Sequence, residues 1–591
     1  MRFLKNVLAT IVGLFLFFAI LFFGFLILGM IIGAGGDSSQ RISVKDNSVI
    51  YFDIDDIAVD HTPEIIIKDF PMFNESNPTG LTHILNAIEY AKTDDKIKGI
   101  VLSNAQNSLG MAQLKSLRDK LRTFKESGKF VVSYADTYTQ QQYYLASVAD
   151  TIYLNPVGEV DFKGLYTELL FMKDLQEKSG VKMEVIRHGK YKSAVEPYLE
   201  NKMSEENRYQ IKQLVTSMWD IFTTDVSQDR NIPVDQLNKI ATEWGARNPK
   251  LAIENNIVDK VDYEDVFEEG IRKALGVDKD EKINSVELTD YVQYTLNKVN
   301  KKSDNRVAVI YAEGAIMPGE GSVKSIGEGY MRASLREAIK DDKIKAIVIR
   351  INSPGGSALT SDIIWREIEL AKMKKPVVVS MGNVAASGGY YIACNANRIF
   401  AEPTTVTGSI GVFGSIPNFK NLTDRIGVYS DTVTTHKNAV TYSPFREMSD
   451  NFREKTTESI NLVYDTFLDR VSKGRGMTVE EVHQIAQGRV WTGVQAKEIG
   501  LVDEIGGLEQ ALVYAMQLAG IEDYRVKNFP VFEKNLEDFF YENTVYPLAK
   551  ARVDLIKEEI GIENYNLLNQ IKDMNNRQGL QLLMPYQIII K

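Results

Sequence analysis

Apolar runs and amphipathic segments alternate along the chain after residue 47. The runs Ile97–Leu102 and Ile344–Ile351 are rich in β-branched residues and have the length of buried strands. The segments Leu114–Phe124 and Ser361–Met373 carry apolar residues at helical spacing. Strands that alternate with helices in this way predict α/β units whose strands are mostly parallel.

An uncharged run from Val7 to Ala34 precedes this pattern and consists mainly of Phe, Leu, Ile and Gly. About 20 apolar residues span a bilayer, so the run is long enough for a membrane helix. Arg2 and Lys5 lie before it and should stay in the cytoplasm. A cleaved signal peptide has a shorter apolar region, and Gly33–Gly36 is only a loose cleavage site. We therefore expect an uncleaved single-pass anchor, with the rest of the chain across the membrane.

The chain contains one sequence pattern twice. The run DDKIKGIV at residues 94–101 recurs as DDKIKAIV at residues 341–348, an offset of 247. At the same offset the pair Tyr143-Tyr144 falls on Tyr390-Tyr391, and the register holds without a gap from about residue 94 to about residue 199. A repeat of this length predicts two copies of one domain. The expected division is an anchor over 1–36, a first repeat over 37–300, a second repeat over 301–530 and a C-terminal extension over 531–591.

The C-terminal extension has no counterpart earlier in the chain. It contains a predicted helix over Leu548–Ile560, which follows Pro547, and an apolar end over Leu582–Ile590. We expect the apolar end to dock on a domain or on a neighbouring subunit.

Composition excludes several classes of site. The net charge of −10 and the pI of about 5.4 argue against nucleic acid as the main partner, because phosphate binding needs a basic face. A single cysteine, Cys394, allows neither an intrachain disulfide nor a cysteine zinc cage. The five histidines show no metal-ligand spacing. We therefore expect no metal and no cofactor.

Residues 380–394 stand out as a candidate functional segment. A β-rich run leads into small residues, then Ser387 with Gly388 and Gly389, then an apolar helical continuation. This order predicts a strand, a tight turn that exposes one hydroxyl, and a helix start whose amides can face a negative charge. By itself the segment could equally be a glycine-rich turn with a solvated serine.

The differences between the two copies favour a functional role. Ser387 falls on Gln140 in the first copy, so that copy has no hydroxyl there. Conversely, Lys192 of the first copy falls on Ala439 of the second. If the copies pack so that these points meet, two incomplete halves form a single Ser–Lys site.

Four motifs together resemble the long form of the signal peptide peptidase A (protease IV) family. They are SPGG at residues 353–356, VAASGGYYIA at 384–393, GKYKSAVEP at 189–197 and GRVWTG at 488–493. The resemblance covers nearly the whole chain. It implies tandem ClpP/crotonase-like α/β domains in a membrane-tethered homotetramer.

The same resemblance implies a site. It places the nucleophile on Ser387, the base on Lys192 and a lysine-orienting hydroxyl on Ser409. A lysine is charged at neutral pH unless burial lowers its pKa, so this reading requires a dry environment for Lys192; the alternative is an ordinary solvated lysine. The amides of Gly356 and Gly388 should form the oxyanion hole, because glycines let a substrate carbonyl approach the backbone.

The sequence thus predicts a membrane-anchored serine endopeptidase that works through an acyl-enzyme. The resemblance implies cleaved signal peptides and other unfolded apolar peptides as substrates, on the extracytoplasmic side of a bacterial inner membrane. Two alternatives remain open at this point. One is a crotonase-type acyl-CoA enzyme, which uses glycine amides as an oxyanion hole but needs neither Ser387 nor an anchor. The other is a non-catalytic membrane scaffold.

Overall fold

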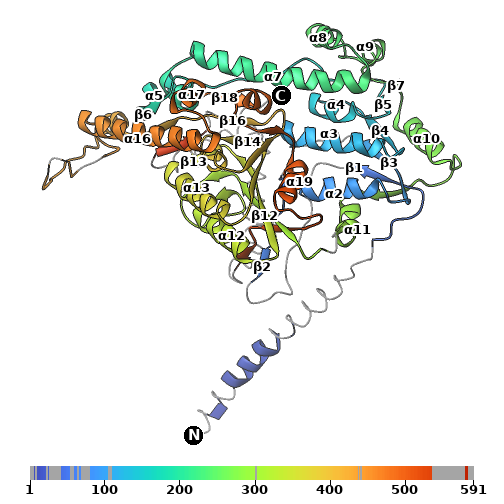
Figure 1. The fold of residues 1–591 in the computed structure, drawn as a ribbon, viewed down its shortest axis with the longest axis horizontal. Helices are drawn as coiled ribbons and strands as arrows, with labels where there is room; N and C mark the ends of the chain where they lie inside the picture. The colour runs from blue at the N-terminus through green and yellow to red at the C-terminus, as the bar shows by residue number, and fades with distance from the viewer. Residues whose placement is uncertain are drawn as a thin grey trace.

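Two sheets of mostly parallel strands, one from each repeat, form the body of the molecule (Figure 1). Both predicted strands and both predicted helices of the repeat are confirmed, with bounds that differ by a few residues. The computed structural model describes residues 5–6, 10–21, 24, 42–52, 59–62, 65–67, 80–103, 109–299, 303–436, 438–439, 442–534 and 580–583. The predicted helix over 548–560 lies outside these residues.

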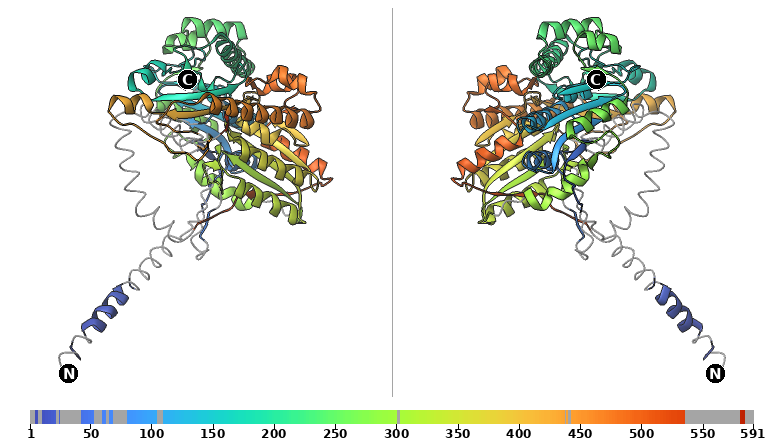
Figure 2. Two further views of the ribbon diagram at one scale, coloured as in Figure 1. Left: turned by 90° about the vertical axis from the view of Figure 1, so that its left-hand side faces the viewer. Right: turned by 90° about the vertical axis from the view of Figure 1, so that its right-hand side faces the viewer.

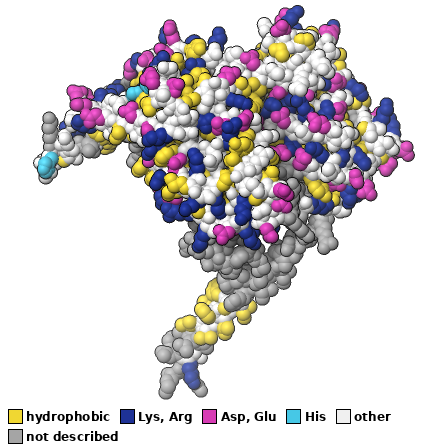
Figure 3. All heavy atoms as spheres, in the orientation of Figure 1, with side chains coloured by type: hydrophobic (Ala, Val, Ile, Leu, Met, Phe, Trp, Pro, Cys, Tyr) yellow, Lys and Arg dark blue, Asp and Glu magenta, His cyan; other side chains and the backbone are white. Residues whose placement is uncertain are grey.

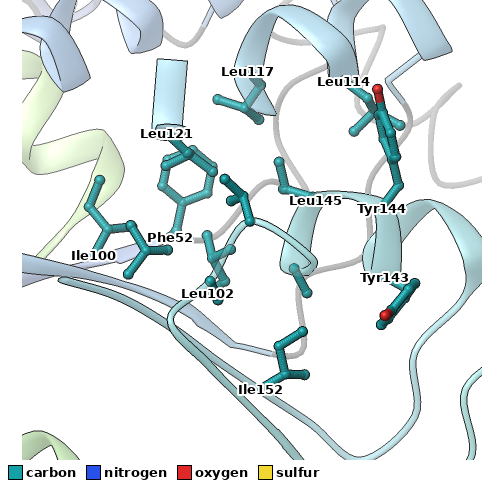
Figure 4. Close-up of a cluster of buried hydrophobic side chains, with 14 of the residues drawn as sticks. Phe52, Ile100, Leu102, Leu114, Leu117, Leu121, Tyr143, Tyr144, Leu145 and Ile152 are labelled. Atoms are coloured by element: carbon teal, nitrogen blue, oxygen red, sulfur yellow. The ribbon is translucent and has the colours of Figure 1, made fainter. Parts of the chain in front are cut away.

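The first sheet has the order β7-β5-β4-β3-β1-β8, and all its strand pairs are parallel. Side chains of β1, β3, α3 and α4 interdigitate on one face, where Phe52, Leu102 and Leu121 are buried (Figure 4). The strands are β1 (Ser48–Phe52), β3 (Ile97–Ser103), β4 (Phe130–Ala135), β5 (Thr151–Leu154), β7 (Lys260–Val261) and β8 (Asn284–Glu287). The helices of this half are α2 (Leu81–Ala91), α3 (Met111–Lys125), α4 (Gln140–Ala146), α5 (Lys173–Ser179), α6 (Glu196–Leu199), α7 (Glu205–Arg230), α8 (Val234–Glu243), α9 (Pro249–Glu254), α10 (Glu264–Leu275) and α11 (Leu288–Val299).

The second sheet has the order β18-β16-β14-β12-β9-β20 and is parallel except for β18. Its central strand, β12, is buried on both faces along most of its length, as a covered parallel strand must be. The strands are β9 (Arg306–Glu313), β12 (Ile344–Ser353), β14 (Val377–Ala386), β15 (Arg398–Ala401), β16 (Val406–Gly408), β18 (Val490–Thr492), β19 (Glu504–Ile505) and β20 (Arg525–Phe529). The helices are α12 (Glu328–Lys340), α13 (Ala358–Lys372), α14 (Gly388–Ala393), α15 (Lys420–Arg425), α16 (Asp450–Arg475), α17 (Val479–Ile485), α18 (Gly493–Glu498) and α19 (Leu508–Leu518).

A third sheet joins segments that are far apart in sequence. Its order is β11 (Ser325–Ile326), β10 (Ala315–Ile316), β13 (Gly355–Ser357), β22 (Leu580–Leu583), β17 (Val412–Asn418) and β6 (Lys182–His188). Strand β6 belongs to the first repeat, yet it pairs antiparallel with β17 of the second. A further small sheet pairs β2 (Ile65–Ile67) with β21 (Phe532–Lys534).

A buried polar network also connects the two repeats. Asn383 of β14 accepts hydrogen bonds from the first amides of α3, those of Ala112 and Gln113, at 3.1 and 3.2 Å. The Gln113 side chain donates to Asp60, which in turn accepts from the guanidinium of Arg350 in β12 at 2.6 Å. Asp60 and Arg350 are both buried, so this ion pair is shielded from water.

Residues 10–21 form an apolar helical segment outside the main body (Figure 2). Its large hydrophobic side chains, from Ile11 to Leu21, are exposed, and they form a yellow patch on the surface (Figure 3). Within the part of the chain that the structure describes, no helix is long and apolar enough to cross a membrane. Most of the predicted anchor over residues 1–36 lies outside that part.

Candidate active site

Ser387 stands at the sharp turn between β14 and α14, as the sequence predicts. Its backbone has φ 55° and ψ −114°, a conformation that is rare for a residue with a side chain. The turn is held on both sides, because the Ser387 amide donates to the carbonyl of Gly408 at 2.8 Å and its carbonyl accepts from Tyr391 at 2.8 Å. The neighbouring structure therefore fixes the hydroxyl in place.

Lys192 of the first repeat reaches this hydroxyl. Its Nζ lies 2.8 Å from Oγ of Ser387, and 3.0 Å from both the carbonyl oxygen and the hydroxyl of Ser409. The Lys192 side chain is completely buried, and this loss of water lowers its pKa well below the ordinary value of lysine. The structure thus brings together the three polar side chains that the sequence singles out.

The pairing of β6 with β17 explains how residues of different repeats meet. His188 at the end of β6 lies opposite Val412 at the start of β17. Lys192 follows the first strand by four residues, and Ser409 precedes the second by three, so both lie at the same edge of the sheet. The loop around Gly488 then binds both segments: Gln487 accepts from Tyr191, and Gly488 donates to Ile410.

Two glycines that the sequence reasoning assigned no role make room for the lysine. A Cβ on Gly488, whose φ is +83°, would lie 2.6 Å from the Cβ and the amide nitrogen of Lys192. A Cβ on Gly411 would lie 3.2 Å from its Cδ. The motif at 488–493 begins with the first of these glycines, but only the packing shows what the two glycines do.

The predicted oxyanion-hole residues lie next to Ser387. Gly355 and Gly356 form the start of β13, with φ values of 98° and 156°. A Cβ on Gly388 would lie 3.2 Å from the Gly356 amide nitrogen, and one on Gly355 would lie 2.7 Å from the Gly388 amide nitrogen. Side chains are therefore excluded here, and the Gly356 amide nitrogen lies close to Gly388, the residue after the serine.

In the first repeat, Gln140 stands at the position that corresponds to Ser387, and its side chain binds a neighbouring backbone segment. Gln140 begins α4, and its Oε1 accepts hydrogen bonds from the amides of Lys163 and Gly164 at 3.2 and 3.0 Å. The Gln140 Nε2 donates to the Gly164 carbonyl at 3.1 Å. A backbone segment thus occupies the surroundings of Gln140, which agrees with a single site per chain.

Cys394 and His188 make packing and hydrogen-bond contacts away from Ser387. The Cys394 thiol is buried and donates to the carbonyl of Tyr391, and burial raises its pKa to about 12, so it stays protonated. The His188 ring stacks on Tyr464 at 4.0 Å and bonds to Asn461. Neither side chain is directed to the Ser387 hydroxyl.

A buried hydroxyl in contact with a buried amine, beside two glycines, is a geometry that suits the nucleophile of a serine hydrolase. Comparison with known proteins specifies the class further. The family model described as peptidase family S49 matches this chain twice, at residues 123–278 and 369–522. The chain belongs to peptidase family S49 and is a serine peptidase.

Three relatives illustrate the extent of the likeness. Protease 4 of Haemophilus influenzae is 36% identical over 529 residues, which cover 87% of this chain and 86% of the relative. Protease 4 of Salmonella typhi is 37% identical, with 86% and 84% covered. The chloroplastic serine protease SPPA of Arabidopsis thaliana is 33% identical, with 73% and 64% covered. Membership in a peptidase family favours the peptidase over the acyl-CoA enzyme and the non-catalytic scaffold.

Proposed function

We propose that the protein is a membrane-anchored endopeptidase in which Ser387 is the nucleophile and Lys192 its general base. The distance of 2.8 Å between Lys192 Nζ and Ser387 Oγ carries this proposal. A neutral amine has two N–H donors and one lone pair. The carbonyl and hydroxyl oxygens of Ser409 can take the two donors, which leaves the lone pair for the Ser387 proton.

The reaction then proceeds in two halves. Oγ of Ser387 attacks the carbonyl carbon of a peptide bond while its proton moves to Nζ of Lys192. The amides of Gly356 and Gly388 stabilise the negative charge on the carbonyl oxygen. Lys192 gives its proton to the leaving amine, and an ester on Ser387 remains. Water, deprotonated by Lys192, hydrolyses the ester and restores the serine.

We propose cleaved signal peptides and other unfolded apolar peptides near the membrane as the substrate class. The resemblance of the motifs supports it, and so does the exposed apolar helical segment over residues 10–21, which suits a bilayer better than water. In this proposal residues 1–36 anchor the chain in the inner membrane of a bacterium. The repeats over 37–300 and 301–530, each of ClpP/crotonase-like fold, and the extension over 531–591 then lie on the extracytoplasmic side.

An unpaired strand position in each repeat supports a homo-oligomer, which we take to be a tetramer. At the repeat offset, residues 165–171 correspond to β17 and residues 429–435 to β6, yet neither segment is a strand here. Both expose large hydrophobic side chains, among them Leu170, Tyr429 and Val433. Pairing of 429–435 in one subunit with 165–171 in the next would repeat the β6–β17 contact, and such a head-to-tail contact can close into a ring.

A serine-reactive probe tests the proposed chemistry. We expect a fluorophosphonate to label Ser387, and peptide hydrolysis to fall about 10²–10⁴-fold in Lys192→Ala. Lys190→Ala is the matched control, because Lys190 is exposed and only two residues away. Full activity in Lys192→Ala, or labelling of a serine other than Ser387, would contradict the proposal.

A further inference from the structure

Helix α7 carries a buried amide on the face that packs against the second repeat. Leu214 and Met218, on successive turns of this helix, belong to a cluster of buried hydrophobic residues from both repeats. Gln210 lies on the same face one turn earlier and is only 1% exposed. Burial of an amide costs free energy unless its hydrogen bonds are made. Within its own helix the amide donates to the side-chain oxygen of Asn207 at 3.2 Å, and its other hydrogen bonds leave the helix.

The Gln210 side chain holds the residues on both sides of Lys192. Its Nε2 lies 3.0 Å from the carbonyl oxygen of Tyr191 and 2.9 Å from the hydroxyl of Ser193. Its Oε1 accepts a hydrogen bond from the amide of Val490 at 3.4 Å. One side chain of the first repeat thus connects the backbone before and after the lysine to strand β18 of the second repeat.

Arg489 makes a second contact between the same two segments. Its guanidinium lies 3.8 Å from the ring centroid of Trp491, and 5.5 and 5.2 Å from those of Tyr191 and Tyr209. The two tyrosines come from the first repeat, and a guanidinium is attracted to the faces of aromatic rings. The backbone of Arg489 also accepts a hydrogen bond from the Ser409 amide at 2.7 Å. Arg489 therefore joins the loop of the lysine to the segment that carries its other hydrogen-bond partner.

The second repeat has different residues at the corresponding positions. Helices α7 and α16 are both 26 residues long and begin at residues 205 and 450, an offset of 245. At this offset Gln210 falls on Lys455, which is exposed and pairs with Glu458. At the offset of 247, Tyr191 falls on Asn438. The buried amide and the stacked ring thus belong to the copy that also has the lysine.

We propose that Gln210 is a positioning residue for Lys192 and that, together with Arg489, it holds the lysine loop against the second repeat, so that the amine stays on Ser387 and out of water. A neutral amine is favoured only while its surroundings are dry. A loop that moved would let water reach the amine, raise its pKa and take it away from the hydroxyl that it must deprotonate. This inference rests on the proposed role of Lys192 as the base.

The Gln210→Leu variant tests the proposal, because it keeps the buried face apolar and removes the hydrogen bonds. We expect kcat/KM for a fluorogenic peptide to fall about 10²-fold. We also expect the acid limb of the kcat/KM profile, which reports the base, to move about one pH unit or more toward higher pH. Ser217→Ala is the matched control, since Ser217 lies on the same helix and its hydroxyl bonds to Thr492 of β18 at 2.9 Å. It should leave the rate and the acid limb close to wild type, and equal changes in both variants would overturn the proposal.

Arg489→Lys provides a second test that keeps the charge and the fold. It loses the planar group that stacks on the three rings, so we expect a smaller fall in kcat/KM, about tenfold, with the acid limb shifted in the same direction. The rate at which a fluorophosphonate labels Ser387 at several pH values should show the same shift without peptide binding. If Gln210→Leu does not fold, Arg489→Lys decides. An acid limb at its wild-type position in every folded variant would overturn the proposal, even where kcat falls.

The Lys192→Ala variant separates this inference from the proposed function. If Lys192→Ala stays fully active, the proposed mechanism fails, and the support of the lysine by Gln210 fails with it. If Lys192→Ala is inactive and the acid limb moves in Gln210→Leu or Arg489→Lys, both hold. If Lys192→Ala is inactive and the acid limb does not move, only the inference about Gln210 and Arg489 fails.

Discussion

The burial that lets Lys192 act as the proposed base also lowers the stability of the folded protein. Burial lowers its pKa, whereas in the unfolded chain it has the ordinary value of 10.5. Between these two pKa values the unfolded state binds more protons, so the free energy of unfolding rises with pH there. Above about pH 10.5 both states hold a neutral amine and the penalty disappears.

Replacement of this lysine by an apolar side chain of similar length should therefore stabilise the protein. We expect Lys192→Met to be inactive, yet to raise the free energy of unfolding at pH 7 by about 1 kcal/mol or more. The gain should shrink as pH rises toward 10.5, which denaturant unfolding at several pH values would measure. A gain that does not vary with pH would instead indicate better packing alone.

Ser409 should affect the rate through the amine that it contacts. Its hydroxyl lies 3.0 Å from Lys192 Nζ, and its carbonyl remains when the hydroxyl is removed. Ser409→Ala should therefore lower kcat by about tenfold, the equivalent of one hydrogen bond, with little change in KM. Steady-state kinetics would show this split; a change in KM alone would assign Ser409 to substrate binding.

The residues of the candidate site could be found from the sequence because the two copies differ at them. The segment around Ser387 stands out by itself, but the differences of Ser387 from Gln140 and of Lys192 from Ala439 appear only when the repeat is aligned. The pattern could not reveal that Gly488 and Gly411 enclose the lysine, because a glycine in a loop leaves no apolar periodicity. Their role depends on close packing between distant segments.

At the scale of elements, the loop around residue 488 packs against the backbone of Lys192 and limits where this residue can lie. Gly488→Ala should place a methyl group against the lysine backbone and lower kcat/KM strongly, by about 10²-fold. Gly427→Ala is a matched control, since Gly427 also has a positive φ, of 78°, but no atom within 4 Å of the added methyl. Gly427→Ala should lose about 1 kcal/mol of stability through its positive φ alone, Gly488→Ala should lose more because of the clash, and only Gly488→Ala should lose activity. Equal activity in the two would show that the loop does not position the lysine.

The sequence could not predict which strands pair with each other across the two repeats. The alternation of apolar and amphipathic segments located β3, β12, α3 and α13, because each has a clear period. It could not show that β6 leaves its own repeat to pair with β17. Nor could it place β22, since four residues are too short for a period and their partners lie more than 150 residues away.

At the scale of the whole molecule, the ion pair between Asp60 and Arg350 links the repeats in a buried setting. Arg350 donates to Asp60, to the hydroxyl of Ser380 and to the carbonyl of Met381, so its removal leaves several buried acceptors unpaired. Arg350→Met should cost about 3–5 kcal/mol in urea unfolding. The double variant Asp60→Leu with Arg350→Met should recover much of this loss, because no lone charge stays buried. Equal losses in the single and double variants would contradict this account.

Assembly should depend on the two segments 165–171 and 429–435, one in each repeat. Val433→Asp and Leu170→Asp should each reduce the molar mass measured by light scattering in detergent toward that of the monomer, because each charge would be buried in the proposed head-to-tail contact. Val157→Asp is the control, since Val157 is 90% exposed and lies outside both segments. An oligomer unaffected by the first two variants would locate the contact elsewhere.

Strand β6 of the first repeat pairs with β17 of the second and so brings Lys192 to Ser387. This pairing affects which mutations the gene can tolerate. Duplication normally leaves a spare copy that tolerates damage while its twin preserves the activity. Here Ser387 lies in one copy and Lys192 in the other, so in the proposed mechanism neither copy is a reserve for its partner. A harmful substitution in either half should therefore be equally exposed to selection, and two separately expressed halves should regain activity only by associating with each other.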